Sequence, residues 1–504
     1  MENEILDVLI VGAGLSGIGA AVHLTEKCPG KSIAIVEGRE RLGGTWDLFR
    51  YPGIRSDSDM YTLGYNFKPW TARKAIADAP SILKYLHETV DEYALHDKIR
   101  FNQKVVDASW SSEEALWTVS LQHGDGSLST VQCNFLHMCS GYYSYEEGHS
   151  PDFPGKAEFD GPIVHPQFWP EDLDYTGKKV VVIGSGATAV TLVPSMTETA
   201  EHVTMLQRSP TYIVSRPGED KWALRFRKVM PGKLAYLLTR WKNVLLGIFM
   251  FNLARKKPAA FKGRLLEMVR DEMGPDVDMT DYTPSYNPWD QRLCLVPDSD
   301  LFDAIKSNKA EIVTDHIETF TKDGIKLKSG KTLAADIIVT ATGLKMLTGG
   351  SAAISVDGQP VNFGEKINYK GVMFSGIPNF GMTMGYTNAS WTLKADLTSE
   401  YVCRLVNFME QNGTPIATPT LPSDGSIGTE PMLDFSSGYV QRAIKDLPKQ
   451  GDRKPWRLNQ NYPKDIINLR HKTVDDGVMV FSKARVGGAV NQETPVAAEA
   501  IAAE

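Results

Sequence analysis

Residues 7–37 read DVLIVGAGLSGIGAAVHLTEKCPGKSIAIVE and decide the fold class of the chain. An apolar run enters a Gly12-x-Gly14-x-x-Gly17 turn, a helical segment follows, and a second apolar run ends at Glu37. Such glycines let the backbone approach a pyrophosphate at a helix N-terminus, and an acidic residue about 20 positions later accepts a hydrogen bond from a ribose hydroxyl. The stretch predicts a strand–helix–strand unit that binds a dinucleotide. The alternative is the same turn with no ligand.

Residues 178–208 repeat this pattern with two informative changes. The turn reads Gly184-x-Gly186-x-x-Ala189, and the second apolar run ends at Gln207 and Arg208 where the first unit has an acid. A carboxylate there repels a 2′-phosphate, whereas a guanidinium can bind one through two hydrogen bonds. We therefore expect FAD at the first unit and NADPH, rather than NADH, at the second. The alternative is that Arg208 is a solvated surface arginine.

Two such units predict an α/β chain with two Rossmann-like dinucleotide-binding domains. After each unit, at residues 101–141 and 311–343, short alternating runs predict a β-meander that returns to the sheet through an apolar strand. Residues 219–270 are basic and apolar with helical spacing and predict a helical insert in the second domain. The expected boundaries are an FAD-binding domain at 1–145 and 370–485, an NADPH-binding domain at 150–215 and 292–369, a helical insert at 216–291, and a disordered tail at 486–504.

The composition is that of an ordinary globular protein and excludes several classes. The 504 residues are 42% hydrophobic and 23% charged, with a formal net charge of −7 that argues against a nucleic-acid binder. The start of the chain has no basic region of a secretory signal, so we expect a cytoplasmic protein. The cysteines are few and scattered, as in a reducing compartment, and their spacing predicts neither a disulfide framework nor a metal site: Cys28, Cys133, Cys139, Cys294 and Cys403.

One apolar stretch, Asn243–Ala254, bears on membrane contact. It has 12 residues between basic flanks, whereas a helix needs about 20 to cross a bilayer. We favour a buried helix. The alternative is a helix that lies on a membrane surface and gives the protein a peripheral membrane contact.

Disulfide reductases share the arrangement of two dinucleotide sites, but they need a close pair of redox cysteines at the flavin. None of the five cysteines forms a C-x-x-C or similar spacing. The sequence therefore does not favour that class.

Two further motifs carry a resemblance to a known family. Phe159-x-Gly161-x-x-x-His165-x-x-x-Trp169-Pro170 precedes the second unit, and Gly43-Gly44-x-Trp46, Tyr51-Pro52-Gly53 and Asp57 follow the first. In these motifs the chain resembles the type I Baeyer–Villiger monooxygenases, from about Leu6 to Leu469. It looks most like the bacterial ethionamide-activating group, on the segments WDLFRYPGIRSDSDMYTLG, NPWDQRLCLVP, GYTNASWTLKADL and PWRLNQNY.

The resemblance assigns three residues to catalysis. Arg292 matches the family's catalytic arginine, a fixed cation that stabilises negative charge on a C4a-peroxyflavin and on its carbonyl adduct. Asp57 matches the carboxylate that orients it. His165 stands in the linker before the second unit, where we expect a hydrogen-bonding role in interdomain movement rather than proton transfer. Without the resemblance, Arg292 would be interpreted as a structural arginine bound to nearby carbonyl groups.

Loop geometry and the resemblance together give the expected cofactor contacts. At FAD and the nicotinamide side they are Gly12, Gly14, Ser16, Gly17, Glu37, Gly44, Thr45, Trp46, Asp47, Leu48, Arg55, Ser56, Asp57 and Val105. At NADPH they are Gly184, Ser185, Gly186, Ala187, Thr188, Ala189, Val190, Gln207 and Arg208. Asn388–Lys394 and Trp456–Tyr462 are candidates for the border of the substrate pocket, and a plain core role is the alternative for both.

The activity that the resemblance implies uses NADPH and O2 to convert ketones into esters or lactones and to oxygenate the sulfur of sulfides and thioamides. One alternative is a flavin monooxygenase restricted to nitrogen or sulfur. Another is an uncoupled NADPH oxidase or an electron carrier.

Overall fold

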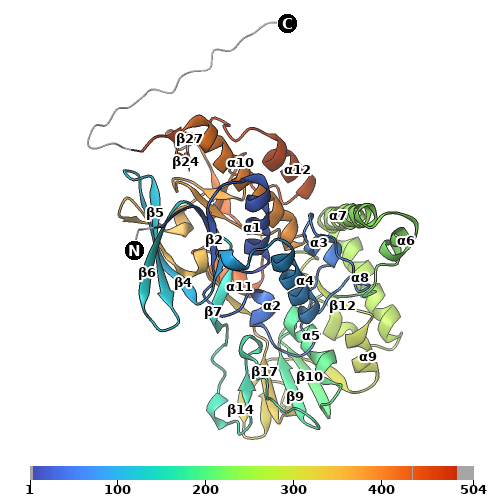
Figure 1. Ribbon diagram of the computed structural model, residues 1–504. Coiled ribbons are helices and arrows are strands. Elements are labelled where there is room, and N and C mark those ends of the chain that lie inside the picture. The colour runs from blue at the N-terminus through green and yellow to red at the C-terminus, as the bar shows by residue number, and fades with distance from the viewer. Residues whose placement is uncertain (1–3, 434, 485–504) are drawn as a thin grey trace.

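The computed structural model describes residues 4–433 and 435–484. Two lobes, each built on a β-sheet, lie one above the other, and a group of helices flanks them on one side (Figure 1). The expected α/β architecture with two Rossmann-like domains is confirmed. The tail expected at 486–504 lies outside the described residues.

The first sheet surrounds the N-terminal strand. β1 (Ile5–Val11) pairs in parallel with β2 (Ile33–Val36) on one side and with β6 (Leu128–Met138) on the other. The expected meander is present, because β4 (Gln103–Ser111), β5 (Leu116–His123) and β6 run antiparallel before β6 meets β1. α1 (Leu15–Lys27) crosses between β1 and β2.

Chain segments from far along the sequence complete this sheet. β19 (Ala353–Val356) pairs with β4 and with β20 (Gln359–Pro360), and β23 (Phe380–Met382) pairs with β6. We expected residues 292–369 to belong wholly to the second domain, so the return at 353–360 is a correction. The sequence signal for this hairpin was the Asp357-Gly358 pair, which is typical of a two-residue hairpin turn. The two strands are too short to show an alternating pattern.

The second sheet is entirely parallel. Its order is β13 (Ala310–Thr314), β10 (His202–Gln207), β9 (Lys179–Ile183), β17 (Ile337–Thr340) and β8 (Ile163–Val164). α5 (Ala187–Met196) joins β9 to β10, and the meander β14 (Ile317–Thr321), β15 (Gly324–Leu327) and β16 (Thr332–Ala334) precedes β17. Four of the five residues of β9 are buried, as expected for a parallel strand covered on both faces.

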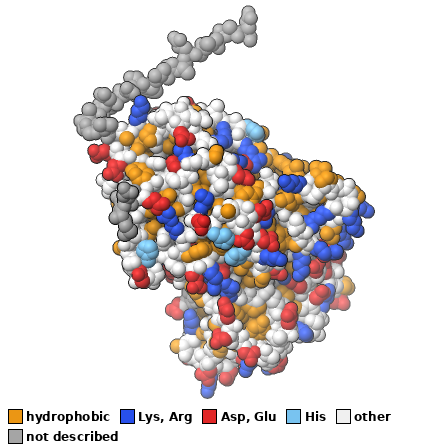
Figure 2. Space-filling model, in the orientation of Figure 1, with side chains coloured by type: hydrophobic (Ala, Val, Ile, Leu, Met, Phe, Trp, Pro, Cys, Tyr) orange, Lys and Arg blue, Asp and Glu red, His pale blue; other side chains and the backbone are white. Residues whose placement is uncertain are grey.

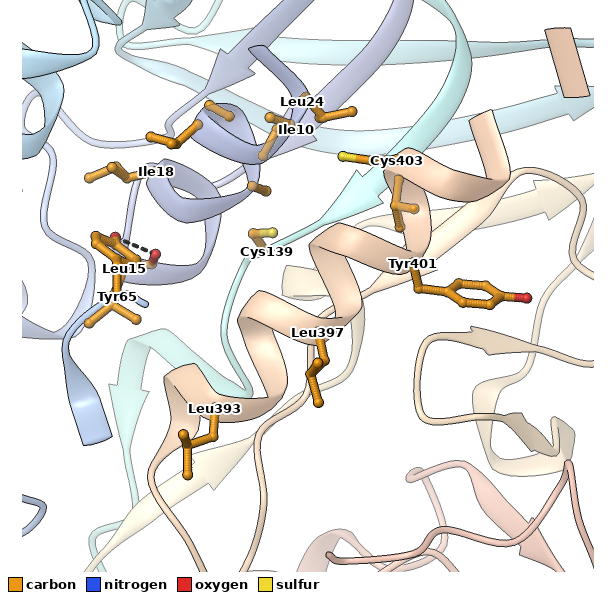
Figure 3. Close-up of a cluster of buried hydrophobic side chains, with 14 of the residues drawn as sticks. Ile10, Leu15, Ile18, Leu24, Tyr65, Cys139, Leu393, Leu397, Tyr401 and Cys403 are labelled. Carbon is orange, nitrogen blue, oxygen red and sulfur yellow. Dashed lines mark hydrogen bonds between the residues drawn. The ribbon is translucent and has the colours of Figure 1, made fainter. Parts of the chain in front are cut away.

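A long helix from the last third of the chain, α10 (Trp391–Asn412), covers α1. Figure 3 shows Leu15, Ile18 and Leu24 of α1 on one side of the cluster and Leu393, Leu397 and Tyr401 of α10 on the other. The Tyr65 hydroxyl closes the cluster by donating to the Leu15 carbonyl at 2.6 Å. Each fully buried side chain of this kind stabilises the fold by about 1.5–3 kcal/mol, so α10 fixes the helix that begins at the first glycine turn.

The expected helical insert is confirmed. Between β11 (Ile213–Arg216) and β12 (Cys294–Pro297) the chain forms α6 (Lys221–Val229), α7 (Gly232–Lys256) and α8 (Pro258–Met273). The expectation that Asn243–Ala254 is a buried helix is wrong. In α7 the Val244 side chain is buried, but Leu245 and Phe249 are 56% and 61% exposed, because only one side of the helix packs on the protein.

Candidate active site

The first glycine turn has the geometry of an anion cradle. Gly12 has φ +103°, and a Cβ on Gly17 would lie 1.8 Å from the Gly12 carbonyl oxygen, so the turn requires glycine at both positions. The N-cap of α1 is Gly14, which has no side chain to cap the helix, and the first turn contains no acidic residue. The amide groups at this positive helix end are therefore oriented for an external anion.

Glu37 is held beside the turn by backbone amides. Its side chain is 6% exposed, and its two oxygens accept hydrogen bonds from the Ala13 and Arg39 N–H groups at 2.8 and 3.0 Å. Desolvation raises the pKa of Glu37 above its ordinary value, although these two hydrogen bonds act in the opposite direction. The acid that ends the first unit is thus fixed in position before any ligand arrives.

A cavity of about 600 Å³ runs along this turn, within the size range of small-molecule sites. It brings together most of the residues expected at the first site: Gly12, Gly14, Ser16, Glu37, Gly44, Thr45, Trp46, Leu48, Ser56, Asp57 and Val105, together with Ala187 of the second turn and Arg292.

Three residues expected at the first site do not line this cavity. Gly17 lies inside the start of α1. The Asp47 carboxylate is 2.8 Å from the guanidinium of Arg39 and also pairs with that of Arg50. Arg55 forms an ion pair with Asp300, at the start of α9 (Asp300–Lys306). Asp47 and Arg55 therefore hold neighbouring segments together, and Arg55 ties the first domain to the second.

The second glycine turn is open to solvent. Gly186 and Ala187 are exposed at the N-terminus of α5, and this helix also has a glycine N-cap without a side-chain cap. Ala189 is fully buried and stands where the first turn has Gly17. Val190 is buried with it, while Ser185 donates its hydroxyl to the Ser209 carbonyl at 3.2 Å. The exposed amides of this turn can receive phosphate as the first turn can.

The two residues at the end of β10 differ in their accessibility. Arg208 is exposed. The Gln207 side chain is 1% exposed, and its amide nitrogen donates to the Asp281 carbonyl and the Thr314 hydroxyl at 2.7 and 2.8 Å. Gln207 was expected to contact the cofactor, but its side chain is engaged inside the protein, which leaves Arg208 to reach a ligand.

Arg292 and Asp57 both line the first cavity and lie close to each other. Arg292 Nη1 lies 3.7 Å from Asp57 Oδ2, and the side chains are 44% and 41% exposed. Desolvation opposes the charge on Arg292, but Tyr142 and Asp57 outweigh it and raise the pKa of the guanidinium, which stays protonated. At this separation and exposure, Asp57 and Arg292 form a partly solvated ion pair without close contact.

A second cavity, of about 780 Å³, begins at the same pair. Asp57, Ser58, Ala389 and Arg292 line both cavities. The lining surface of the second cavity is more apolar than polar, although charged side chains such as Glu219, Lys221 and Lys464 also line it. The helices α7 and α8 supply a group of its apolar residues: Val244, Leu246, Ile248, Met250, Phe251, Phe261, Leu265 and Met268. Parts of both expected border segments, 388–390 with Leu393 and 459–462, also line it. An apolar chamber thus opens onto a fixed cation in the cofactor-sized cavity.

Sequence reasoning missed five aromatic residues of the first cavity: Tyr142, Tyr143, Tyr145, Tyr386 and Trp391. Tyr142 and Trp391 stack with ring centroids 5.1 Å apart, and Trp391 Nε1 donates to the Ser16 hydroxyl at 2.8 Å. Trp391 lies in a segment expected to border a substrate, yet it joins α10 to the first glycine turn. No sequence pattern indicated Tyr142, because its position depends on how β6 leaves the sheet.

Comparison with known proteins decides the family. Residues 75–251 match the flavin-binding monooxygenase-like family, and residues 10–70 match an NAD(P)-binding Rossmann-like domain. Over 483 residues the chain is 54% identical to the FAD-containing monooxygenase EthA of Mycobacterium tuberculosis, covering 95% of this chain and 98% of that protein. The chain belongs to the FAD-containing monooxygenases.

Solved structures of other monooxygenases have the same fold. Oxidized steroid monooxygenase bound to NADP matches 83% of this chain and 88% of its own, with 24% identity and a TM-score of 0.70. Cyclohexanone monooxygenase bound to ε-caprolactone matches 82% and 90%, with 23% identity and a TM-score of 0.70.

His165 of this monooxygenase lies outside the residues that line the two cavities. Its Nε2 lies 3.3 Å from the Gly343 carbonyl, and its Nδ1 accepts from the Gln167 N–H at 3.2 Å. Desolvation lowers the pKa of His165 below its ordinary value, so the ring is neutral near pH 7. Gly343 precedes β18 (Leu344–Met346), which pairs with β7 (Tyr143–Gly148) where the chain passes between the domains. This geometry fits the linker role expected of His165.

The cysteines of this monooxygenase are free thiols. Cys139 lines the first cavity, where burial raises its pKa to about 12. Cys294 lines the second cavity, and burial likewise raises its pKa to about 12. Because neither is a thiolate at neutral pH, neither has the reactivity that disulfide exchange requires.

Proposed function

We propose that the chain binds FAD in the 600 Å³ cavity and NADPH at the second glycine turn. Three features support FAD: the uncapped start of α1, the buried Glu37 and the cavity that joins them. The uncapped start of α5 and the exposed Arg208 support a nucleotide with a 2′-phosphate. In the solved structures with this fold, the steroid monooxygenase carries NADP.

The reaction that fits the site best is Baeyer–Villiger oxidation of a ketone to an ester or lactone, with S-oxygenation of sulfides and thioamides as a second activity. FAD, once reduced by NADPH, supplies the activated oxygen derived from O2. The observation that carries the proposal is the position of Arg292, a cation shared by the cofactor-sized cavity and the apolar chamber.

Each of the residues at the two cavities and in the linker has a separate role in the proposed reaction. Arg292 binds the negative charge that develops on oxygen when a carbonyl carbon is attacked, an interaction worth most in a site with little water. Asp57 keeps the guanidinium in one orientation. The apolar walls formed by α7 and α8 bind the hydrocarbon part of the substrate. His165 acts through the linker and not on the substrate.

Product analysis with NADPH, 18O2 and two substrates tests the proposal. The substrates are an aliphatic ketone and an aryl methyl sulfide, and the variants are Arg292→Ala and Arg216→Ala. Arg216 lines the second cavity but not the first, so it is a matched control. We expect one labelled oxygen in the ester, a loss of about 100-fold or more in ester formation for Arg292→Ala, and no comparable loss for Arg216→Ala.

The other outcomes point to different functions. Labelled sulfoxide without ester, from the wild-type protein, would favour a monooxygenase restricted to nitrogen or sulfur. Hydrogen peroxide as the sole oxygen product, with either substrate, would favour an NADPH oxidase. Ester formation that survives in Arg292→Ala would leave the reaction standing and refute the role of the arginine.

A further inference from the structure

The helical insert carries an exposed apolar surface that the proposed reaction does not explain. Eight of the thirteen exposed large hydrophobic side chains in the described residues lie within 28 residues of α6 and α7: Trp222, Val229, Leu234, Leu237, Leu238, Leu245, Leu246 and Phe249. Along α7, Leu234, Leu238, Leu245 and Phe249 follow helical spacing and share one side. In Figure 2 hydrophobic side chains gather at the edge where α7 lies, with basic side chains beside them.

The opposite side of α7 is fixed to the protein. Arg240 is 2% exposed and donates to the carbonyl groups of Tyr61 and Gly64 at 2.9 and 2.7 Å. Asn243 donates to the Asp59 carboxylate at 2.9 Å. By length and composition alone α7 could cross a membrane, with 28% of its apolar window buried. These buried polar contacts hold it against the first domain instead, so its other side faces outward and is free to meet a partner.

The positive charge of residues 221–266 indicates which class of partner the exposed apolar face would bind. Residues 221–266 contain twelve Lys and Arg and neither Asp nor Glu, in a chain of net charge −7. Lys242 and Arg255 pair with Asp220 and Asp290. Lys233, Lys256 and Lys257 are exposed at the two ends of α7. An apolar stripe flanked by cations is complementary to an anionic phospholipid surface, which offers acyl chains and negative headgroups together.

This surface also reaches the apolar chamber. Trp222 and Leu246 are 54% and 44% exposed, and both line the 780 Å³ cavity. Leu245 and Phe249, on the adjoining positions of α7, do not line it. The opening of the chamber therefore lies at the border of the exposed apolar surface.

We propose that the exposed face of α6 and α7 docks on an anionic phospholipid bilayer and that the chamber takes apolar substrates from that bilayer. The proposal that this face docks on a membrane rests only on the exposed apolar and basic side chains. The proposal that substrates enter the chamber from the bilayer rests on the proposed function, because it requires that the chamber bind the substrate. Leu234, Leu238, Leu245 and Phe249 insert between the headgroups, and the lysines at the ends of α7 bind them.

Co-sedimentation of the FAD-loaded protein with vesicles tests the docking. The vesicles are phosphatidylcholine alone or mixed with phosphatidylglycerol, at low and high salt. We expect binding to the anionic vesicles that weakens with salt, and a loss of about tenfold or more for Leu245→Gln/Phe249→Gln. Lys256→Gln/Lys257→Gln is expected to weaken the binding and flatten its salt dependence. Leu128→Gln/Val480→Gln alters two apolar residues exposed elsewhere (69% and 47%) and is the matched control.

A second measurement separates docking from entry. Turnover of a long-chain ketone dissolved in vesicles should fall in Leu245→Gln/Phe249→Gln, while turnover of a short water-soluble ketone stays as in the wild type. Equal binding by this variant and the wild type, or binding independent of anionic lipid, overturns the docking. A dimer that dissociates in the same variant, without vesicle binding, means that a second copy covers the face instead. If no ketone is oxidised in any form, the proposed function fails while the sedimentation result still stands.

Discussion

Replacing Gly17 by alanine should remove the first cofactor from the protein. The new Cβ would lie 1.8 Å from the Gly12 carbonyl oxygen, whereas real Cβ contacts essentially never fall below 3.0 Å, so the backbone must move by at least 1.2 Å. Little room exists for this, because the Gly12 N–H bonds to the Val36 carbonyl and the Ala13 N–H to Glu37, both at 2.8 Å. Overpacking of this kind costs about 1–3 kcal/mol or more, and each 1.4 kcal/mol lost from binding weakens affinity about tenfold.

The assay is the amount of FAD that remains bound per protein after gel filtration, together with the melting temperature with and without added FAD. Gly263→Ala in α8 is the matched control, because a Cβ at Gly263 would meet nothing within 4 Å. Its helix should gain up to about 1 kcal/mol, and its FAD content should not change. If Gly17→Ala retains full FAD and the wild-type melting temperature, the close approach of Gly17 to the Gly12 carbonyl does not limit FAD binding.

Three further predictions concern the second site, the insert and the response to acid. Arg208→Gln should lower kcat/KM for NADPH by about 10- to 100-fold and leave that for NADH unchanged, because a charged hydrogen bond to the 2′-phosphate is lost. Arg240→Met should destabilise the protein by about 3–5 kcal/mol, because the carbonyls of α3 (Met60–Leu63) and Asp396 lose a buried cationic partner. Burial lowers the pKa of His137 to about 4 from an ordinary 6.5, so stability should fall by roughly 3 kcal/mol as the pH drops between these values. His137→Gln should remove this part of the acid sensitivity.

Each of these has a measurement that can contradict it. For Arg208→Gln, steady-state kinetics that show equal losses with both nucleotides would mean general damage to the turn. For Arg240→Met, thermal unfolding is compared with that of Arg264→Met, an exposed arginine on α8, and equal melting temperatures would refute the anchoring role. For His137, the stability falls as the pH falls because the unfolded chain binds a proton below about pH 6.5, whereas the folded chain binds it only near pH 4. A wild type and a variant with parallel stability–pH curves would disprove it.

The two glycine turns made the fold predictable, because a turn of this geometry requires small residues at fixed positions in the sequence. Gly17 and Ala189 occupy corresponding positions at the starts of α1 and α5, and the buried apolar runs on either side form β1, β2, β9 and β10 as expected. The meander before β6 also followed from its alternation. Local patterns of this length are decided by residues close together in the chain.

What the sequence did not predict depends on distant contacts. The hairpin at 353–360 joins the first sheet only because β4 offers a free edge. Helical spacing placed the insert correctly, but the same apolar residues suit a buried helix and a surface helix, and only the packing of Arg240 decides between them. Gln207 and Asp47 were expected at cofactors because of their neighbours in sequence, whereas their side chains bond within the protein.

The discontinuity of the first sheet sets an order for folding during synthesis. All five strands of the second sheet lie between residues 163 and 340, so this domain can close as one uninterrupted segment. The first sheet is complete only after β19 and β23 have been synthesised, and its cavity is complete only after Trp391 has been synthesised. At about 5–20 residues per second, the roughly 250 residues between β6 and Trp391 take on the order of 10–50 s. On a ribosome, the domain that begins the chain is therefore completed second, and the cavity along its glycine turn is closed only after every strand of the second sheet has been made.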